Sequence, residues 1–138
     1  MYILNHKETD FFTEWQAVKS YIGKSIIEMK NKLTDLHCHI LPGIDDGAQK
    51  PDISGALLLS EQQQGIRQIM FTPHFYAHDL KVEDYCRHRN AAYESMKETI
   101  GRLGLVTALG AEVRMDEELF DIDFSDLRMG DSRYLLLE

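Results

Sequence analysis

Two histidines stand two residues apart in the run TDLHCH at positions 34–39, at the end of an apolar strand-like segment. Alternate residues of a β-strand point to the same face, so His37 and His39 can converge on one point. A Pro-Gly turn and the adjacent carboxylates Asp45 and Asp46 follow. Imidazole nitrogen suits Zn, Mn, Fe or Ni, and carboxylate oxygen suits the harder Mg and Mn. This mixture of donors predicts a hydrolytic metal centre and not a structural zinc site, although a bare His-x-His pair also occurs by chance.

Each of three further apolar segments is followed by one residue of a type that binds metals. These residues are His74 in a Thr-Pro-His sequence, Glu112 in a Gly-Ala-Glu sequence and Glu138 after three leucines. Because α/β folds build their active sites at the carboxyl ends of parallel strands, we expect these side chains to meet the two histidines. The alternative to a ligand role for His74 is an ordinary histidine in a turn. The position of His74 at the end of a strand makes this alternative less favoured.

Strand-like and helix-like segments alternate along the chain after residue 32. Glycines mark the helix ends: Gly65 closes the first helix, and Gly101 and Gly104 bracket the end of the second. Repeated strand-helix units predict an α/β fold with parallel strands and right-handed crossovers. We expect strands at 33–37, 66–72, 105–109 and 134–138, helices at 53–64 and 82–103, and a short helix near 117–120.

The string DLHCHILPGIDDGA at positions 35–48 is the most distinctive part of the chain. Together with Thr-Pro-His at 72–74 and Gly-Ala-Glu at 110–112, it resembles the PHP (polymerase and histidinol phosphatase) superfamily. More narrowly, it resembles the bacterial protein-tyrosine phosphatase branch of capsule and exopolysaccharide synthesis. The resemblance implies that residues 32–138 form a partial PHP-type (β/α) barrel of about four parallel strands with helices. It covers the first half of the family domain, and residues 1–31 stand outside it.

The resemblance also implies a set of metal ligands. His37 and His39 would hold one ion, and Glu112 would bridge to a second ion that Glu138 completes. Asp46 and His74 would serve a third ion, although Asp45 beside Asp46 leaves open which of the two caps the turn. The predicted ligands are therefore His37, His39, Asp46, His74, Glu112 and Glu138.

The implied cofactor is a cluster of divalent metal ions, with Mn²⁺ first and Fe, Zn or Mg as alternatives. Such a cluster lowers the pKa of a bound water to about 7 and clamps the attacking and leaving oxygens of a phosphoryl transfer. His37, His39 and Glu112 are therefore the predicted catalytic residues, acting through metal-activated water. Family ligands from later His-Pro-Glu-Arg and Ser-Asp-Ala-His segments have no counterpart here, so we expect a fragment that is inactive by itself.

The implied activity is that of a metal-dependent protein-tyrosine phosphatase. Its implied partner is a phosphotyrosine-bearing protein, a bacterial tyrosine kinase that controls polysaccharide export. One alternative is another PHP phosphoesterase, of the histidinol-phosphatase or exonuclease kind, which the LPGIDDGA sequence at 41–48 disfavours. A second alternative is a half-barrel that binds metal or a partner without turnover. Arg67 and Arg114 are conceivable phosphate-binding groups, but the resemblance gives that role to the arginine of the absent His-Pro-Glu-Arg segment.

Cys38 lies between two candidate ligands, which raises the alternative of a thiol-dependent phosphatase. Such enzymes hold phosphate with a Cys-x5-Arg loop. Ile44 stands at the arginine position counted from Cys38, and Ala92 stands there counted from Cys86. We therefore expect the Cys38 side chain to point away from the two histidines and to pack behind the strand.

The 138 residues suit one domain, and a net charge of −8 argues against binding to nucleic acid phosphates. No stretch approaches the roughly 18 apolar residues of a transmembrane segment, and the amino terminus lacks a secretory signal pattern. Two cysteines make no disulfide framework, so we expect a cytoplasmic protein. His6, His78 and His88 lie outside every motif and are expected at the surface.

Residues 1–31 carry an amphipathic pattern of their own. Apolar residues recur at spacings of three and four, and lysines collect in the second half, where they favour a helix end. We expect an N-terminal helix packed on its own domain or on a second copy, with a membrane surface or a docking partner as the alternative. Together with the open edge expected at the strand 134–138, this helix could support a homo-oligomer. The apolar positions are Phe11, Trp15, Val18, Ile22, Ile26 and Met29.

Overall fold

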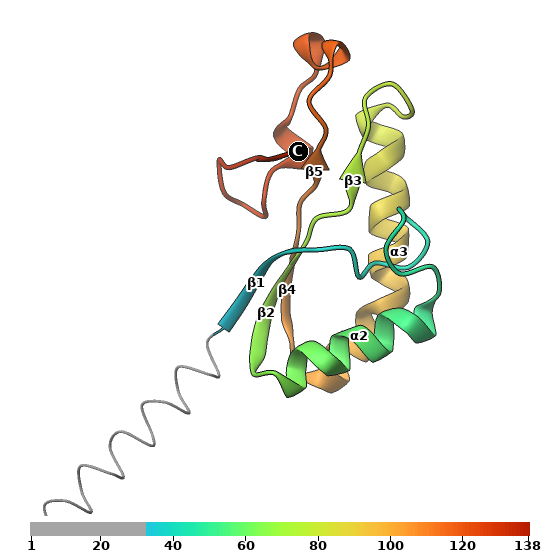
Figure 1. Cartoon of the computed structure of the whole chain (residues 1–138), viewed down its shortest axis with the longest axis vertical. Coiled ribbons are helices and arrows are strands. Elements are labelled where there is room, and N and C mark those ends of the chain that lie inside the picture. The colour runs from blue at the N-terminus through green and yellow to red at the C-terminus, as the bar shows by residue number, and fades with distance from the viewer. Residues whose placement is uncertain (1–32) are drawn as a thin grey trace, which may run out of the picture.

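The computed structural model describes residues 33–138 (Figure 1). The segment expected to form an N-terminal helix lies in residues 1–32, outside that range. Strands and helices alternate in the first part of the chain, as the sequence predicts. In chain order the elements are β1 (Leu33–Cys38), α2 (Pro51–Gln63), β2 (Ile66–Phe71), β3 (His74–Phe75), α3 (Val82–Leu103), β4 (Val106–Leu109), β5 (Glu112–Val113), the 3₁₀ helices η1 (Glu117–Asp121) and η2 (Ser125–Leu127), and β6 (Leu136–Leu137).

The strands form two three-stranded parallel sheets, with the orders β1-β2-β4 and β3-β5-β6. The second sheet continues the first, because β3 and β5 lie beyond the ends of β2 and β4 (Figure 1). Backbone hydrogen bonds cross the breaks: the Gly110 N–H donates to the Phe71 carbonyl at 2.8 Å, and the Glu112 N–H donates to the Pro73 carbonyl at 3.0 Å. Pro73 has no N–H of its own, which interrupts strand pairing at this point.

The two long helices pack against each other beside the first sheet (Figure 1). The core that they share with the sheet buries Leu58 of α2, Met96 and Ile100 of α3, and Ile69 and Phe71 of β2. Burial of these apolar side chains is the main force that holds the helices on the sheet.

Local sequence explains where the helices begin and end. α3 occupies the predicted range, and Gly104 ends it with a left-handed φ of 65°, a conformation that glycine adopts without strain. α2 begins at Pro51, two residues before the prediction, because the fixed φ of proline suits the first helical position. Neither of these two helices combines the length and the apolar character that a membrane-crossing helix needs.

A second, smaller core lies beneath β3, β5 and β6, around the fully buried Phe75. Two polar side chains of α3 reach from it to backbone carbonyls at the strand breaks. The Tyr85 hydroxyl donates to the Pro73 carbonyl at 2.7 Å, and the buried Arg89 guanidinium donates to the Gly110 carbonyl at 2.9 Å. These bonds tie the end of the first sheet to the helix behind it.

Residues 33–138 form an open arrangement of parallel strands and not a closed barrel. Closure of this kind of barrel takes about eight strands, more than the described residues supply. The predicted strands at 33–37, 66–72 and 105–109 match β1, β2 and β4 to within one residue at each end. The predicted strand at 134–138 is shorter, at Leu136–Leu137, and the helix predicted near 117–120 is the 3₁₀ helix η1.

Candidate metal centre

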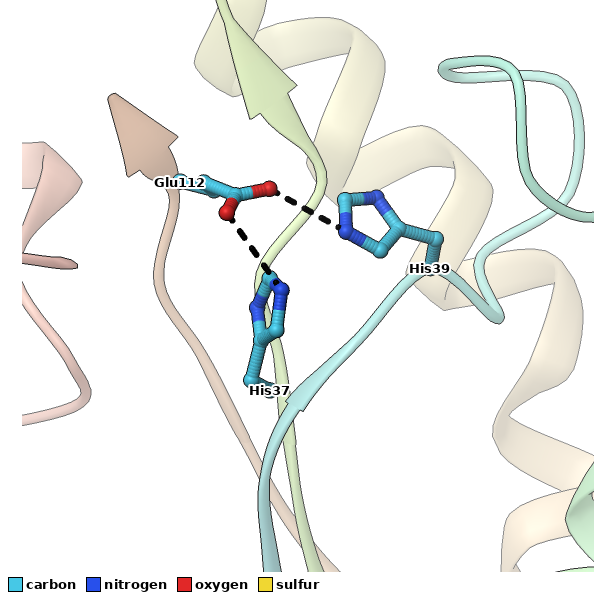
Figure 2. A group of neighbouring side chains, drawn as sticks. All are labelled: His37, His39 and Glu112. Carbon is cyan, nitrogen blue, oxygen red and sulfur yellow. Dashed lines mark ion pairs between the residues drawn. The ribbon is translucent and has the colours of Figure 1, made fainter. Parts of the chain in front are cut away.

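His37 in β1 and His39 just beyond it point to the same side, toward Glu112 at the start of β5 (Figure 2). His37 Nε2 is 3.3 Å from Glu112 Oε1, and His39 Nε2 is 3.2 Å from Glu112 Oε2. The Cys38 side chain instead packs against the core between the sheet and the helices. The predicted convergence of the two histidines and the predicted packing of Cys38 are therefore confirmed.

His74 and Glu138 reach the same place from neighbouring strands. His74 begins β3 and stands in register with Glu112 of β5. His74 Nδ1 is 3.1 Å from Glu112 Oε2 and 3.4 Å from Glu138 Oε2, and Glu138 directly follows β6. Asp46 approaches from the loop after β1, with its Oδ1 3.6 Å from His74 Nε2.

The potential ligand atoms fall into three overlapping groups. The members of each group lie within 4.8 Å of one another. Glu112 belongs to two of the groups, and a carboxylate can serve two ions because it has two oxygens. The structure thus brings the predicted ligands together, and their roles as metal ligands stay a prediction. The groups are His37, His39 and Glu112; His39, Asp46 and His74; and His74, Glu112 and Glu138.

The donor set fits divalent cations. Two ligands that each lie about 2.1 Å from a shared ion, at right angles, are about 3 Å apart. The nitrogen-to-oxygen distances in the cluster, from 3.1 to 3.6 Å, are close to that value. His74 Nδ1 is buried and has no hydrogen-bond partner among residues 33–138, as expected of an atom that faces a cation.

Asp45 does not join these groups but holds two of the histidines. Its Oδ2 accepts hydrogen bonds from His39 Nδ1 at 2.7 Å and from the His74 backbone N–H at 3.1 Å, and its Oδ1 accepts from the Gly47 N–H at 3.0 Å. The Asp45 side chain is 4% exposed, against 87% for Asp46. The geometry therefore separates the adjacent carboxylates: Asp45 organises the turn, and Asp46 faces His74.

Thr72 contacts the Nδ1 atom of His37, as Asp45 contacts the Nδ1 atom of His39. Its buried hydroxyl accepts a hydrogen bond from the Cys38 N–H at 3.1 Å and lies 2.8 Å from His37 Nδ1. With their Nδ1 atoms engaged, His37 and His39 turn Nε2 toward Glu112, which is how outer hydrogen-bond partners orient metal-binding histidines. The sequence analysis left open whether Asp45 or Asp46 caps the turn, and it missed Asp45 and Thr72 as partners of the histidine rings.

The loop after β1 folds back onto His39. The Ala48 N–H donates to the His39 carbonyl at 3.0 Å, and the Gly43 N–H donates to the Ala48 carbonyl at 2.7 Å. A Cβ atom at Gly47 would collide with the backbone carbonyl and the Cβ of His39. Glycine at position 47 therefore permits the close approach that keeps His39 in the cluster.

Cys38 is not placed as a nucleophile. Burial, and after it the charge of Asp35, raises the pKa of the Cys38 thiol well above its ordinary range. Its Sγ lies 3.6 Å from the Met70 carbonyl oxygen. The thiol therefore stays protonated near neutral pH, which counts against a thiol-dependent reaction.

A cavity of about 590 Å³ adjoins the cluster. Asp46 and His74 belong to its wall, as do the aromatic side chains of Tyr76 and Tyr85 and the exposed His88. Its volume is in the range of small-molecule binding pockets, so a substrate side chain has room beside the candidate ligands.

Fold and cluster together define a class of protein: a parallel α/β domain with histidine and carboxylate side chains that could hold metal ions, gathered at the carboxyl ends of its strands. A family model for capsular polysaccharide synthesis, CpsB/CapC, matches residues 33–138. The chain belongs to this family, and the resemblance to capsule-synthesis phosphatases is confirmed.

Individual relatives agree with this assignment. The tyrosine-protein phosphatase YwqE of Bacillus subtilis is 33% identical over 110 residues, and the tyrosine-protein phosphatase CpsB of Streptococcus pneumoniae is 32% identical over 114. Each match covers 77% of this chain and 42% or 44% of the relative, so the chain spans less than half the length of these relatives. Crystal structures of YwqE and CpsB, described as unique metal-dependent tyrosine phosphatases, include a chain that matches with a TM-score of 0.61 and 28% identity. That match covers 76% of this chain and 43% of the other.

Proposed function

We propose that the protein carrying this chain is a metal-dependent protein-tyrosine phosphatase. The observation that carries the proposal is the sharing of Glu112 between the two histidines of the β1 end and His74 of β3. Phosphate monoesters hydrolyse extremely slowly unaided, and clustered cations are a recurrent means of neutralising the phosphoryl charge. The names of the relatives point to the same reaction.

In this proposal the six side chains of the cluster hold the cations. Divalent cations bound there supply positive charge to the phosphoryl group and make water a stronger acid. Thr72 and Asp45 engage the Nδ1 atoms of His37 and His39, so that each Nε2 presents its lone pair to the cluster. Mixed nitrogen and oxygen donors favour Mn²⁺, with Fe, Zn or Mg as alternatives.

The proposed substrate is a phosphotyrosine-bearing protein, specifically a bacterial tyrosine kinase that controls capsule or exopolysaccharide synthesis. The family description concerns capsular polysaccharide synthesis, and the relatives are named tyrosine-protein phosphatases. The cavity beside His74, with Tyr76 and Tyr85 in its wall, offers an aromatic side chain room next to the cluster. Both cysteines are free thiols, which supports the reducing cytoplasm as the site of the reaction.

The proposal also treats residues 32–138 as the first half of a PHP-type barrel. The chain matches only 42% or 44% of its relatives, and β6 is an edge strand of its sheet among the described residues. An exposed strand edge can pair with another copy, and a partial ligand set leaves the coordination of the cations unfixed. We therefore expect residues 1–138 alone to bind Mn²⁺ weakly and to hydrolyse phosphotyrosine no faster than buffer.

The test is hydrolysis of a phosphotyrosine peptide in saturating Mn²⁺, before and after chelation. It compares residues 1–138 with a form of the protein that contains the full family domain. We expect turnover in the longer form only, with loss on chelation and in His39→Ala but not in Cys38→Ser. Turnover that survives chelation and disappears in Cys38→Ser would refute the metal mechanism. Chelator-sensitive turnover by residues 1–138 would instead refute the half-barrel argument.

A further inference from the structure

Two pairs of side chains stand opposite each other on the face of β3 and β5 that carries the cluster. His74 is in register with Glu112, and their side chains are 3.1 Å apart. Two residues further along each chain segment, the Arg114 guanidinium carbon lies over the Tyr76 ring, 5.7 Å from its centroid. The Tyr76 ring in turn stacks on the His74 ring, with 5.4 Å between the centroids. Arg114 is thus connected to the cluster through one aromatic ring.

Strand alternation explains why these side chains share a face. Phe75 and Val113, which separate the two pairs, are fully buried on the opposite side. The Arg114 N–H donates to the Phe75 carbonyl at 3.1 Å, so the pairing continues past the two-residue strands. One step further, His78 and Asp116 form a third pair, with 3.3 Å between Nδ1 and Oδ2.

The guanidinium group of Arg114 is not used to hold the described part of the fold together, in contrast to those of two other arginines near the sheet. The guanidinium groups of Arg67 and Arg89 donate to backbone carbonyls and thus support the fold. Arg114 is exposed and forms neither a hydrogen bond nor an ion pair through its side chain with any residue from 33 to 138. Its neighbour in the β6 register, Glu138, directs its carboxylate to His74 at 3.4 Å instead.

We propose that Arg114, held against the Tyr76 ring, binds a phosphoryl oxygen of the substrate at the cluster. The proposal rests on the proposed phosphatase function. It assigns a substrate contact to an arginine that the sequence analysis considered together with Arg67 and did not select. The carboxylates of Glu112, Glu138 and Asp46 repel a phosphate dianion, so positive charge in addition to the cations favours its binding. A guanidinium presents parallel N–H donors that match phosphate oxygens.

The position of Arg114 suits the phosphoryl group better than a distant part of the substrate. Arg114 and Glu112 are alternate residues of one strand segment, so their Cα atoms are about 6.6 Å apart on the same face. Tyr76 also lines the cavity beside His74. A phosphoryl group over the cluster, with its aryl group in that cavity, would therefore lie next to the guanidinium. Stacking on Tyr76 limits the freedom of the arginine side chain before substrate binds.

The experiment measures the affinity for inorganic phosphate and the KM for para-nitrophenyl phosphate, using the Mn²⁺-loaded protein with its full family domain. The variants are Arg114→Gln, Arg114→Lys and the control Arg102→Gln, which removes the same charge from the last turn of α3. Metal content is measured in each variant, so that loss of cations is not mistaken for loss of the phosphate contact. We expect Arg114→Gln to weaken phosphate binding and raise KM by about tenfold to a hundredfold. Arg114→Lys should recover part of this loss, and Arg102→Gln should change neither quantity.

Unchanged phosphate affinity in Arg114→Gln would overturn the proposal. If the unmodified protein binds phosphate but hydrolyses no aryl phosphate, the proposed function fails. In that case weaker phosphate binding by Arg114→Gln would still uphold the contact.

Discussion

Replacing Asp45 by asparagine should loosen the metal centre while leaving all of its candidate ligands in the chain. The Asp45 carboxylate accepts hydrogen bonds from His39 Nδ1 and from the backbone N–H groups of His74 and Gly47, at 2.7 to 3.1 Å. An asparagine amide keeps one acceptor oxygen and turns an NH₂ group toward at least one of these donors. Because the Asp45 side chain is only 4% exposed, water has little access to replace the lost acceptor.

The size of the effect follows from the burial and the charge of Asp45. A hydrogen bond to a charged group contributes about 1.5–3 kcal/mol, and a buried donor left unpaired costs about 1–3 kcal/mol. With at least one bond lost, Asp45→Asn should lower the free energy of unfolding by about 2–3 kcal/mol. The His39 ring also loses the partner that fixes its orientation, and removing such a partner typically weakens metal binding by about 10–100-fold.

Asp46→Asn is the matched control, because it makes the same chemical change at the next residue. The Asp46 side chain is 87% exposed, so its replacement should change the free energy of unfolding by no more than about 0.5 kcal/mol. Its loss should still weaken Mn²⁺ binding, since Asp46 is a candidate ligand. The measurements are urea unfolding of the metal-free protein and calorimetric titration with Mn²⁺. Wild-type stability and wild-type Mn²⁺ affinity in Asp45→Asn would refute the reasoning.

Three other perturbations test the remaining parts of the site. Gly47→Ala should cost about 3 kcal/mol of stability in thermal unfolding, because the added Cβ collides with His39. Glu112→Gln should weaken Mn²⁺ binding in calorimetry more than Glu138→Gln, because Glu112 faces three imidazoles at 3.1 to 3.3 Å and Glu138 faces one at 3.4 Å. Burial raises the pKa of Cys38, so iodoacetamide should label it far more slowly in the native chain than in urea at neutral pH. Equal labelling rates would contradict the partly buried position of this thiol against the core.

Elements with local markers are predictable from this sequence, and elements made by tertiary pairing are not. α3 is long, amphipathic and ended by Gly104, so its range follows from the residues themselves. β3 and β5 contain two residues each and exist because His74–Phe75 and Glu112–Val113 pair across the fold. No periodicity can develop over two residues, so these strands become visible only in three dimensions.

The candidate ligands were within reach of the sequence, whereas the residues that orient them were not. The residue type of His74, Glu112 and Glu138, together with a place after an apolar segment, is sufficient to predict a shared site. Thr72 acts on His37, 35 residues away in the chain. Asp45 acts on His39, six residues away, and on the His74 N–H, 29 residues away. Those contacts depend on how the loop after β1 closes and on the register in which β1 pairs with β2, and sequence patterns specify neither.

The strand breaks bring the ligands together, and α3 stabilises those breaks. At these breaks α3 adds side-chain donors to the backbone carbonyls, although the Pro73 carbonyl also accepts the Glu112 N–H at 3.0 Å. The Tyr85 hydroxyl supplies one to Pro73 at 2.7 Å, and the buried Arg89 guanidinium supplies one to Gly110 at 2.9 Å. Both donors belong to one helix, so the first residues of β3 and β5 are held relative to each other by protein hydrogen bonds, independently of a cation. If the cluster holds cations as proposed, side chains positioned in this way would bind them with a smaller ordering cost than side chains that the cations must assemble.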